Sequence, residues 1–121
     1  MENKSVLIMA KRKKMSSRKQ KLLNEIVLIC NENIRDPKFG VLQLAIEINI
    51  SERQLYRITQ DLTGVTPHKF IREIKLQAAK EIIENGSFKT IAQVASSVGF
   101  ERTDYFSKLY FDRFGVIPRE A

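Results

Sequence analysis

Two arginines and a tyrosine in the stretch SERQLYRITQDLTG are the residues best suited to recognising another molecule. Arg53, Tyr56 and Arg57 stand three and four positions apart, a spacing that puts side chains on one face of a helix. An arginine guanidinium can donate two hydrogen bonds at once to O6 and N7 of guanine. This cluster therefore offers chemistry for contacting bases.

Residues that could catalyse a reaction or bind a metal are too few. Cys30 and His68 are the only cysteine and the only histidine of the sequence, and one residue of each kind does not make a metal site. Cys30 shares the apolar side of a predicted helix with Leu23, Ile26 and Val27, which favours buried packing, whereas His68 is expected on an exposed first turn. Because the sequence also shows no convergent carboxylate pair and no glycine-rich phosphate loop, we expect no enzyme and no cofactor. An enzyme that uses Cys30 is the alternative.

The positive charge is concentrated at the N-terminus. The chain carries a net charge of +7, and residues 1–21 hold eight basic groups against one acid, whereas residues 22–121 hold 13 of each sign. A basic arm indicates nucleic acid or another anionic surface as partner; a solvated leader is the other interpretation. We expect residues 1–16 to form a disordered arm or an upstream linker. The apolar run VLIMA within it is too short to span a bilayer, although it could be the edge of a truncated membrane segment.

The rest of the chain has the pattern of amphipathic helices, with apolar residues three and four positions apart. Ser17, Ser51 and Thr90, each followed by glutamine three positions later, predict capping boxes. Thr66–Pro67 predicts a further helix start, and glycines 64, 86 and 115 predict helix ends. The predicted fold class is all-α with about seven helices. Their expected ranges are 17–34, 41–48, 52–63, 67–84, 91–98, 102–114 and a short turn at 118–121.

One helical pair occurs twice in the sequence. The stretch LAIEINISERQLYRITQDLTGVTP aligns with VASSVGFERTDYFSKLYFDRFGVIP, and the second copy has one extra residue in its turn, within GFER. Ala45 and Ala95 occupy equivalent positions, where a small side chain lets two helices cross closely. A short helix, a tight turn and a second helix are the helix-turn-helix arrangement, whose second helix enters the major groove of DNA. One copy alone would also fit a generic helical hairpin.

A long predicted helix at 67–84 separates the two copies. At ~1.5 Å per residue it would be ~27 Å long, so it could hold two recognition helices about one DNA turn, ~34 Å, apart. Its apolar residues are expected to form a single stripe that contacts both units. The stripe comprises Phe70, Ile71, Ile74, Ala78 and Ile82.

Aromatic residues crowd the second copy. Helical spacing assigns Phe106, Tyr110 and Phe114 to the core, and Phe100 and Tyr105 are expected to pack on the turn. Phe111 lies outside that stripe, so we expect it to be largely exposed or to face a partner.

The stretch TIAQVASSVGFERTDYFSKLYFDRFGVIPRE resembles the signature of the AraC/XylS-type transcription regulators, and the resemblance extends over about residues 17–121. The stretch SERQLYRITQDLTGVTPHKFIREIKLQAAKEII looks closest to the C-terminal output domains of bacterial hybrid sensor kinases and response regulators. The resemblance implies helix-turn-helix units at about 41–63 and 91–114, joined by the long helix. It also implies sequence-specific binding of double-stranded DNA and regulation of transcription in the bacterial cytoplasm.

The partners follow from that resemblance. RNA polymerase is a candidate protein partner, and an upstream sensing or dimerisation domain is expected if the chain is a fragment. We expect no small-molecule ligand in this domain and no membrane contact.

The base-reading positions of the family map onto both second helices. Aspartate can accept from cytosine N4 but repels phosphate, so the second recognition helix should read more weakly than the first. The expected base contacts are Arg53, Tyr56, Arg57, Thr103, Asp104, Ser107 and Lys108. The expected contacts to the DNA backbone are Ser51, Gln60, Thr90 and Arg102.

The chain departs from the family where basic residues usually follow the recognition positions. Gln60, Asp61, Phe111 and Asp112 stand there instead. Because phosphate contacts supply much of the affinity for DNA, binding should be weak unless the arm or a dimerising partner compensates. The alternative function is a helical protein-interaction module with degraded DNA binding.

Overall fold

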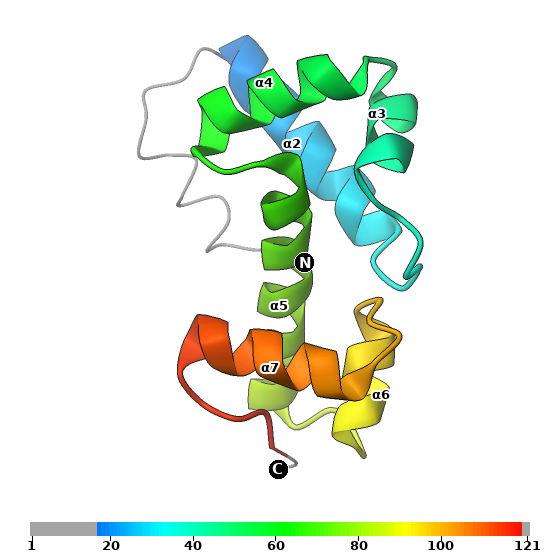
Figure 1. Ribbon diagram of the computed structural model, residues 1–121, viewed down its shortest axis with the longest axis vertical. Helices are drawn as coiled ribbons and strands as arrows, with labels where there is room; N and C mark the ends of the chain where they lie inside the picture. The colour runs from blue at the N-terminus through cyan, green and yellow to red at the C-terminus, as the bar shows by residue number, and fades with distance from the viewer. Residues whose placement is uncertain (1–16, 120–121) are drawn as a thin grey trace. The chain divides into compact units, whose positions relative to one another are not determined.

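The computed structural model describes residues 17–119; residues 1–16, which include the predicted arm, and residues 120–121 lie outside the described range. The described residues form six helices and no strand, which confirms the all-α prediction (Figure 1). The helices are α2 (Ser17–Glu32), α3 (Val41–Ile48), α4 (Glu52–Thr63), α5 (Pro67–Asn85), α6 (Ile91–Ser97) and α7 (Thr103–Phe114).

These helices fall into two compact units, each with one copy of the repeated helical pair. Within the described range, the first unit consists of residues 17–33 and 39–74, and the second unit consists of residues 34–38 and 75–119. Helix α5 contributes residues to each, up to Ile74 in the first unit and from Lys75 in the second.

In the first unit, α2 packs against α3 and α4, and α3 packs against α4 (Figure 1). Ala45 is buried on the inner side of α3, where its small side chain lets the neighbouring helices approach. Cys30 is buried in α2, as predicted. The other buried apolar residues of this unit are Leu23, Ile26, Val27, Phe39, Leu44, Leu55, Leu62, Phe70, Ile71 and Ile74.

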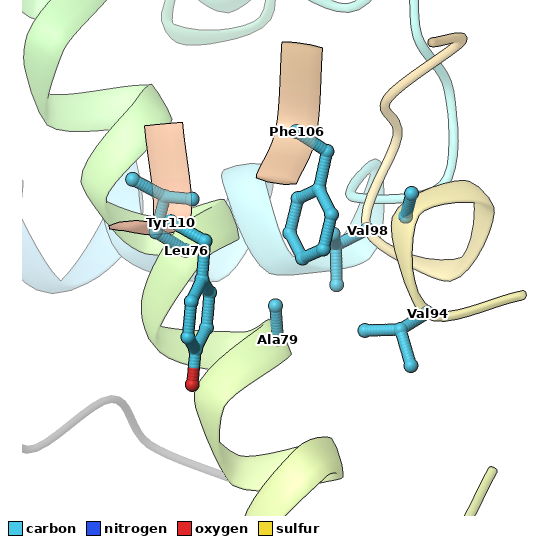
Figure 2. Close-up of a cluster of buried hydrophobic side chains, with 7 residues drawn as sticks. Leu76, Ala79, Val94, Val98, Phe106 and Tyr110 are labelled. Carbon is cyan, nitrogen blue, oxygen red and sulfur yellow. The ribbon is translucent and has the colours of Figure 1, made fainter. Parts of the chain in front are cut away.

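The core of the second unit forms where α6 and α7 pack together with residues of α5. Phe106 is fully buried at 0% exposure, and its ring centroid lies 5.8 Å from that of Tyr110. Figure 2 shows the side chains that converge there from α5, from α6 and the residue after it, and from α7. They are Leu76, Ala79, Val94, Val98, Phe106 and Tyr110.

The turn inside each pair repeats the same backbone geometry. Asn49 and Gly99 both adopt the left-handed conformation, with φ of 65° and 84°. The following amide bonds back to the inner alanine in each copy, Ile50 N to Ala45 O at 3.1 Å and Phe100 N to Ala95 O at 2.9 Å. Since α4 begins after Ser51 and α7 begins after Arg102, the extra residue of the second copy lies after Phe100.

Three of the four predicted helix starts carry a bond from the predicted cap. Ser51 forms a full capping box, because its Oγ accepts from Gln54 N and its own N–H donates to Gln54 Oε1, both at 3.1 Å. Thr66 Oγ1 accepts from Lys69 N at the start of α5. Thr90 Oγ1 accepts from Gln93 N at 3.0 Å, but the Gln93 side chain bonds Lys89 N instead of Thr90 N. The box predicted at Thr90 is therefore shifted by one residue.

The prediction for Ser17 remains open, because α2 begins at Ser17 and the residues before it are outside the described range. The predicted glycine stops are confirmed: Gly64, Gly86 and Gly115 all have positive φ. Other helix ends differ from the predicted ranges by one or two residues. Residues 118–119 are not helical, so no described residue supports the short turn predicted at 118–121.

The apolar stripe predicted for α5 contacts both units, as expected. Phe70, Ile71 and Ile74 are buried in the first unit, and Ala78 and Ile82 are partly buried against the core of the second unit. The part of α5 in the second unit also buries Leu76 and Ala79, which the stripe does not include. These two residues were not expected because the second unit packs against a wider face of α5 than the stripe.

Candidate nucleic-acid interface

Helix α4 has one buried face and one exposed face. Leu55, Thr59 and Leu62 are buried, and their spacing of four and three residues leaves the rest of the helix outside the core. Arg53, Tyr56 and Arg57 are all exposed. The structure therefore brings the three base-contacting residues predicted in this helix onto an accessible surface, at its N-terminal half.

An open groove of about 480 Å³ lies beside this surface. Arg53 and Tyr56 line it from α4, together with Thr66, Pro67 and His68 at the start of α5. Sequence reasoning assigns His68 no role. The only signal near it is the Thr66–Pro67 helix start, which does not say that the start of α5 returns to α4.

Helix α7 also has one buried and one exposed face, but fewer of its predicted base contacts are exposed. Phe106 and Tyr110 are buried, and Thr103 and Ser107 are half-buried, which leaves Asp104 and Lys108 as the exposed members of the four predicted base contacts. Tyr105, predicted to pack on the turn, contacts Phe100 edge-on at 6.3 Å and remains 48% exposed.

Arg102 and Asp104 are joined to each other at the start of α7. Arg102 Nε donates to Asp104 Oδ1 at 3.2 Å, and Arg102 Nη2 donates to Asp104 Oδ2 at 2.7 Å. The hydrogen bond from Arg102 lowers the pKa of Asp104, and a backbone hydrogen bond from Tyr105 lowers it further. The same bond and the aspartate charge raise the pKa of Arg102. Both side chains therefore stay charged at neutral pH.

The four residues predicted to contact the DNA backbone are all exposed. Ser51, Thr90 and Arg102 are the N-cap residues of α4, α6 and α7, and Gln60 lies on α4. Backbone N–H groups at a helix start favour a phosphate.

Asp61, an acidic residue at a position where the resemblance predicts a basic one, is paired with Lys19. Lys19 Nζ lies 3.0 Å from Asp61 Oδ2, and the two side chains are 54% and 59% exposed. Helix α2 thus brings a lysine to the acidic position of α4. No local signal in the sequence predicts this pair, because the two residues stand 42 positions apart.

Phe111 is 48% exposed, which confirms the prediction that it lies outside the core of α7. It lines an open groove of about 660 Å³ together with Tyr110, Phe114, Val116 and Ile117. The side chains of Val116 and Ile117 are also exposed.

Comparison with known proteins shows which family of domains has this helical repeat. A family model described as "Helix-turn-helix domain" matches residues 44–121. The structure also superposes on the crystal structure of a Chromobacterium violaceum protein, described as a transcriptional regulator of the AraC-type DNA-binding domain-containing proteins. The two share 30% sequence identity with a TM-score of 0.76, over 87% of this chain and 92% of the other. The chain belongs to the AraC-type helix-turn-helix family.

Longer proteins contain a stretch that is similar to this chain. The HTH-type transcriptional regulator GbdR of Pseudomonas aeruginosa is 34% identical over 108 residues, which cover 89% of this chain and 29% of GbdR. Histidine kinase P4 of Formosa agariphila is 31% identical over 106 residues, which cover 88% of this chain and 8% of the kinase. The chain thus spans less than a third of the length of these two relatives.

The cysteine and the histidine lie on different helices, α2 and α5. Cys30 is buried and His68 is exposed. Within residues 17–119, no group of three histidine, cysteine or acidic residues could hold a metal ion. None of the helices in this range is long and apolar enough to cross a membrane.

Proposed function

We propose that the protein binds double-stranded DNA sequence-specifically and regulates transcription. The observation that carries this proposal is the exposure of equivalent faces on α4 and α7, each the second helix of a helix-turn-helix pair in an AraC-type domain. The second helix of such a pair reads base edges in the major groove with residues near its N-terminus. The relatives named above are from bacteria. In a bacterium, a protein that binds chromosomal DNA works in the cytoplasm.

The exposed faces divide into base contacts and backbone contacts. Arg53 and Arg57 offer two guanidinium forks from one helix, so the first unit should contribute more to specificity than the second. The proposed base contacts are Arg53, Tyr56, Arg57, Thr103, Asp104, Ser107 and Lys108. The proposed backbone contacts are Ser51, Gln60, Thr90 and Arg102. Because the two helices present different residues, one chain should read an asymmetric site.

The chain would act as the output domain of a larger signalling regulator. Its similarity to 8% of a histidine kinase and to 29% of a transcriptional regulator supports this role. An upstream sensing or dimerisation domain would then control it, and RNA polymerase is the proposed protein partner during transcription.

A second candidate is a helical protein-interaction module that no longer binds DNA well. Asp61, Asp104 and Asp112 place negative charge on the two recognition helices. Phe111 exposes an aromatic ring to an open groove that aromatic, aliphatic and charged residues line. Negative charge near a phosphate backbone weakens binding, whereas an exposed aromatic residue is typical of protein interfaces.

Selection from random duplex DNA, followed by gel shift at a series of salt concentrations, separates the two candidates. A DNA-reading domain should enrich one asymmetric sequence and bind it more tightly than random duplex at every salt concentration. An interaction module should enrich no sequence and lose its residual binding as salt rises. The latter result would contradict the proposed function.

A further inference from the structure

In the Arg102–Asp104 pair, the carboxylate occupies one edge of the guanidinium and leaves the other edge free for another acceptor. The carboxylate takes the side of the guanidinium that carries Nε and Nη2, through the two bonds at 3.2 and 2.7 Å. A guanidinium has five N–H groups in a fixed plane. The pair therefore leaves the two N–H groups of Nη1 and the outer N–H of Nη2 available on the other edge. Those groups include two parallel donors.

Two parallel donors match one base in the major groove. Guanine presents O6 and N7 as neighbouring acceptors, and arginine binds them bidentately. Arg102 is the N-cap residue of α7, at the end of the helix whose residues meet base edges in a helix-turn-helix protein.

We propose that Arg102 reads a guanine with its outer edge and that Asp104 is a positioning residue that holds Arg102 for this contact. The inference rests on the proposed function, because it requires that α7 enter the major groove. It changes two of the roles given above: Arg102 becomes a base contact instead of a backbone contact, and Asp104 acts through Arg102 instead of contacting a base itself.

The charge of the pair favours a base over a phosphate. Arginine and aspartate together carry no net charge, so the pair gains little from the phosphate backbone, which attracts cations. The edge of guanine is neutral and needs donors rather than charge. The carboxylate also has both oxygens engaged by Arg102, which makes Asp104 a poor acceptor for cytosine N4.

The ion pair orients the Arg102 side chain rather than stabilising the fold. The two side chains are 74% and 71% exposed, and an exposed ion pair contributes little to folding stability. Asp104 lies in the first turn of α7, so the acceptor is held by a helix two residues after the arginine. A long, flexible arginine gains direction from an acceptor that is fixed in this way.

The two copies of the repeat carry an arginine at different positions near the start of the second helix. With the offset that aligns Phe106 with Leu55, Asp104 corresponds to Arg53 and Arg102 corresponds to Ser51. The second copy thus also has a guanidinium at the start of its recognition helix. It belongs to the N-cap residue Arg102, and Asp104 in the first turn of the helix holds it.

The test is selection from random duplex DNA with the unaltered chain and with Asp104→Ala, Arg102→Ala, Arg102→Lys and the double alanine variant. The unaltered chain should select a guanine in the half of the site that the second unit reads. Each alanine variant should lose that guanine preference, about 5- to 150-fold for a bidentate contact, while it keeps the sequence preference of the other half. Arg102→Lys should lose only part of the preference, because lysine lacks the planar fork of arginine but can still donate to guanine. The double alanine variant should lose no more of the guanine preference than either single alanine variant, because both residues serve the same contact.

A modified base tests whether Arg102 contacts N7 of the selected guanine. Replacing the selected guanine by 7-deazaguanine removes N7, so it should weaken binding by the unaltered chain but leave binding by Arg102→Ala unchanged. Thermal unfolding of each variant should match that of the unaltered chain, because both side chains are exposed.

Three outcomes would overturn the inference. If Asp104→Ala keeps the guanine preference, Asp104 does not position Arg102. If Arg102→Ala weakens binding to all sequences equally, Arg102 is a phosphate contact. If Arg102→Ala keeps a cytosine preference that Asp104→Ala loses, Asp104 is the base reader. In all three cases the unaltered chain still selects a sequence, so the proposed function stands; failure to select any sequence contradicts the proposed function itself.

Discussion

A β-carbon on Gly99 would collide with the backbone oxygen of Ile34. Gly99 lies in the turn between α6 and α7 with φ of +84°, and Ile34 belongs to the segment 34–38 of the same unit. The turn of the second unit therefore needs glycine for two reasons, the left-handed backbone and the close approach of another chain segment. The equivalent residue of the first unit, Asn49, has the same backbone conformation and carries a side chain.

We expect Gly99→Ala to destabilise the protein by about 3 kcal/mol, because left-handed strain and a backbone collision add together. Gly115→Ala is the matched control: φ is +75° there, but an added β-carbon meets nothing within 4 Å. It should cost only the left-handed conformation, about 1–2 kcal/mol. Chemical denaturation of the two variants measures the difference, and equal destabilisation would show that the contact with Ile34 does not constrain the turn.

Phe106 and Phe111 should respond very differently to truncation, although both lie on α7. Phe106 is 0% exposed and Phe111 is 48% exposed. Phe106→Ala should cost about 3–5 kcal/mol, because it leaves a cavity in the core of the second unit. Phe111→Ala should cost less than about 1 kcal/mol. Thermal or denaturant unfolding compares them, and a large destabilisation by Phe111→Ala would mean that this ring is part of the core.

The first recognition helix should dominate specificity. Arg53→Ala or Arg57→Ala should weaken binding to the selected site by about 1–3 kcal/mol and relax the preference at one or two base pairs. Thr103→Ala, at a half-buried position of α7, should cost less. Binding titrations on single-base variants of the site measure these effects, and the proposal is wrong if the stronger half of the site belongs to α7.

The features that local sequence determines were predictable. Helix ranges, the Ser51 capping box and the left-handed glycines depend on residues within four positions of each other, so a single stretch contains the signal. The exposure of Arg53 and Arg57 follows in the same way from the spacing of buried Leu55 and Leu62 on one helix.

Contacts between distant segments were not predictable from one sequence. Nothing local pairs Lys19 with Asp61 or brings Ile34 to Gly99. The burial of Leu76 and Ala79 on α5 is a further case, since it depends on what packs against that part of the helix. The Arg102–Asp104 pair is different, because its residues are only two positions apart. The sequence does not show whether the two side chains bond each other or contact DNA separately.

The Lys19–Asp61 pair should affect DNA binding more than it affects folding. Asp61→Ala removes an acid from α4 and leaves the positive charge of Lys19 in place, so it should tighten binding to both random and specific DNA. Lys19→Ala should weaken both, because it removes the lysine that lies beside the carboxylate. The free energy of unfolding should change by less than about 1 kcal/mol in either variant, since the pair is exposed.

A charge-matched control distinguishes this local effect from a change in net charge. Glu81→Ala also removes one exposed acid, from α5. Gel shifts at a fixed salt concentration should show a smaller increase in affinity for Glu81→Ala than for Asp61→Ala. Equal increases would mean that only the net charge of the domain matters.

The basic arm should set the strength of DNA binding and not the choice of site. Residues 22–121 carry equal numbers of basic and acidic groups, while DNA affinity depends largely on the release of counterions from phosphates. Deleting residues 1–15 removes five of the eight basic groups of residues 1–21. Because phosphate contacts carry no direct sequence information, the deletion should weaken binding to specific and random duplex by similar factors. It should also flatten the plot of log affinity against log salt, by about 0.9 for each phosphate that the protein no longer neutralises.

A second variant separates the charge of the arm from its length. Replacing Lys4, Lys11, Arg12, Lys13 and Lys14 by glutamine keeps all residues but removes the same five positive charges. If the arm follows the phosphates, this variant should reproduce the flatter salt dependence of the deletion on the same duplexes. If the slope is unchanged in both variants, residues 1–15 do not contact DNA, and a second DNA-binding domain held nearby by a dimerising partner becomes the favoured source of affinity.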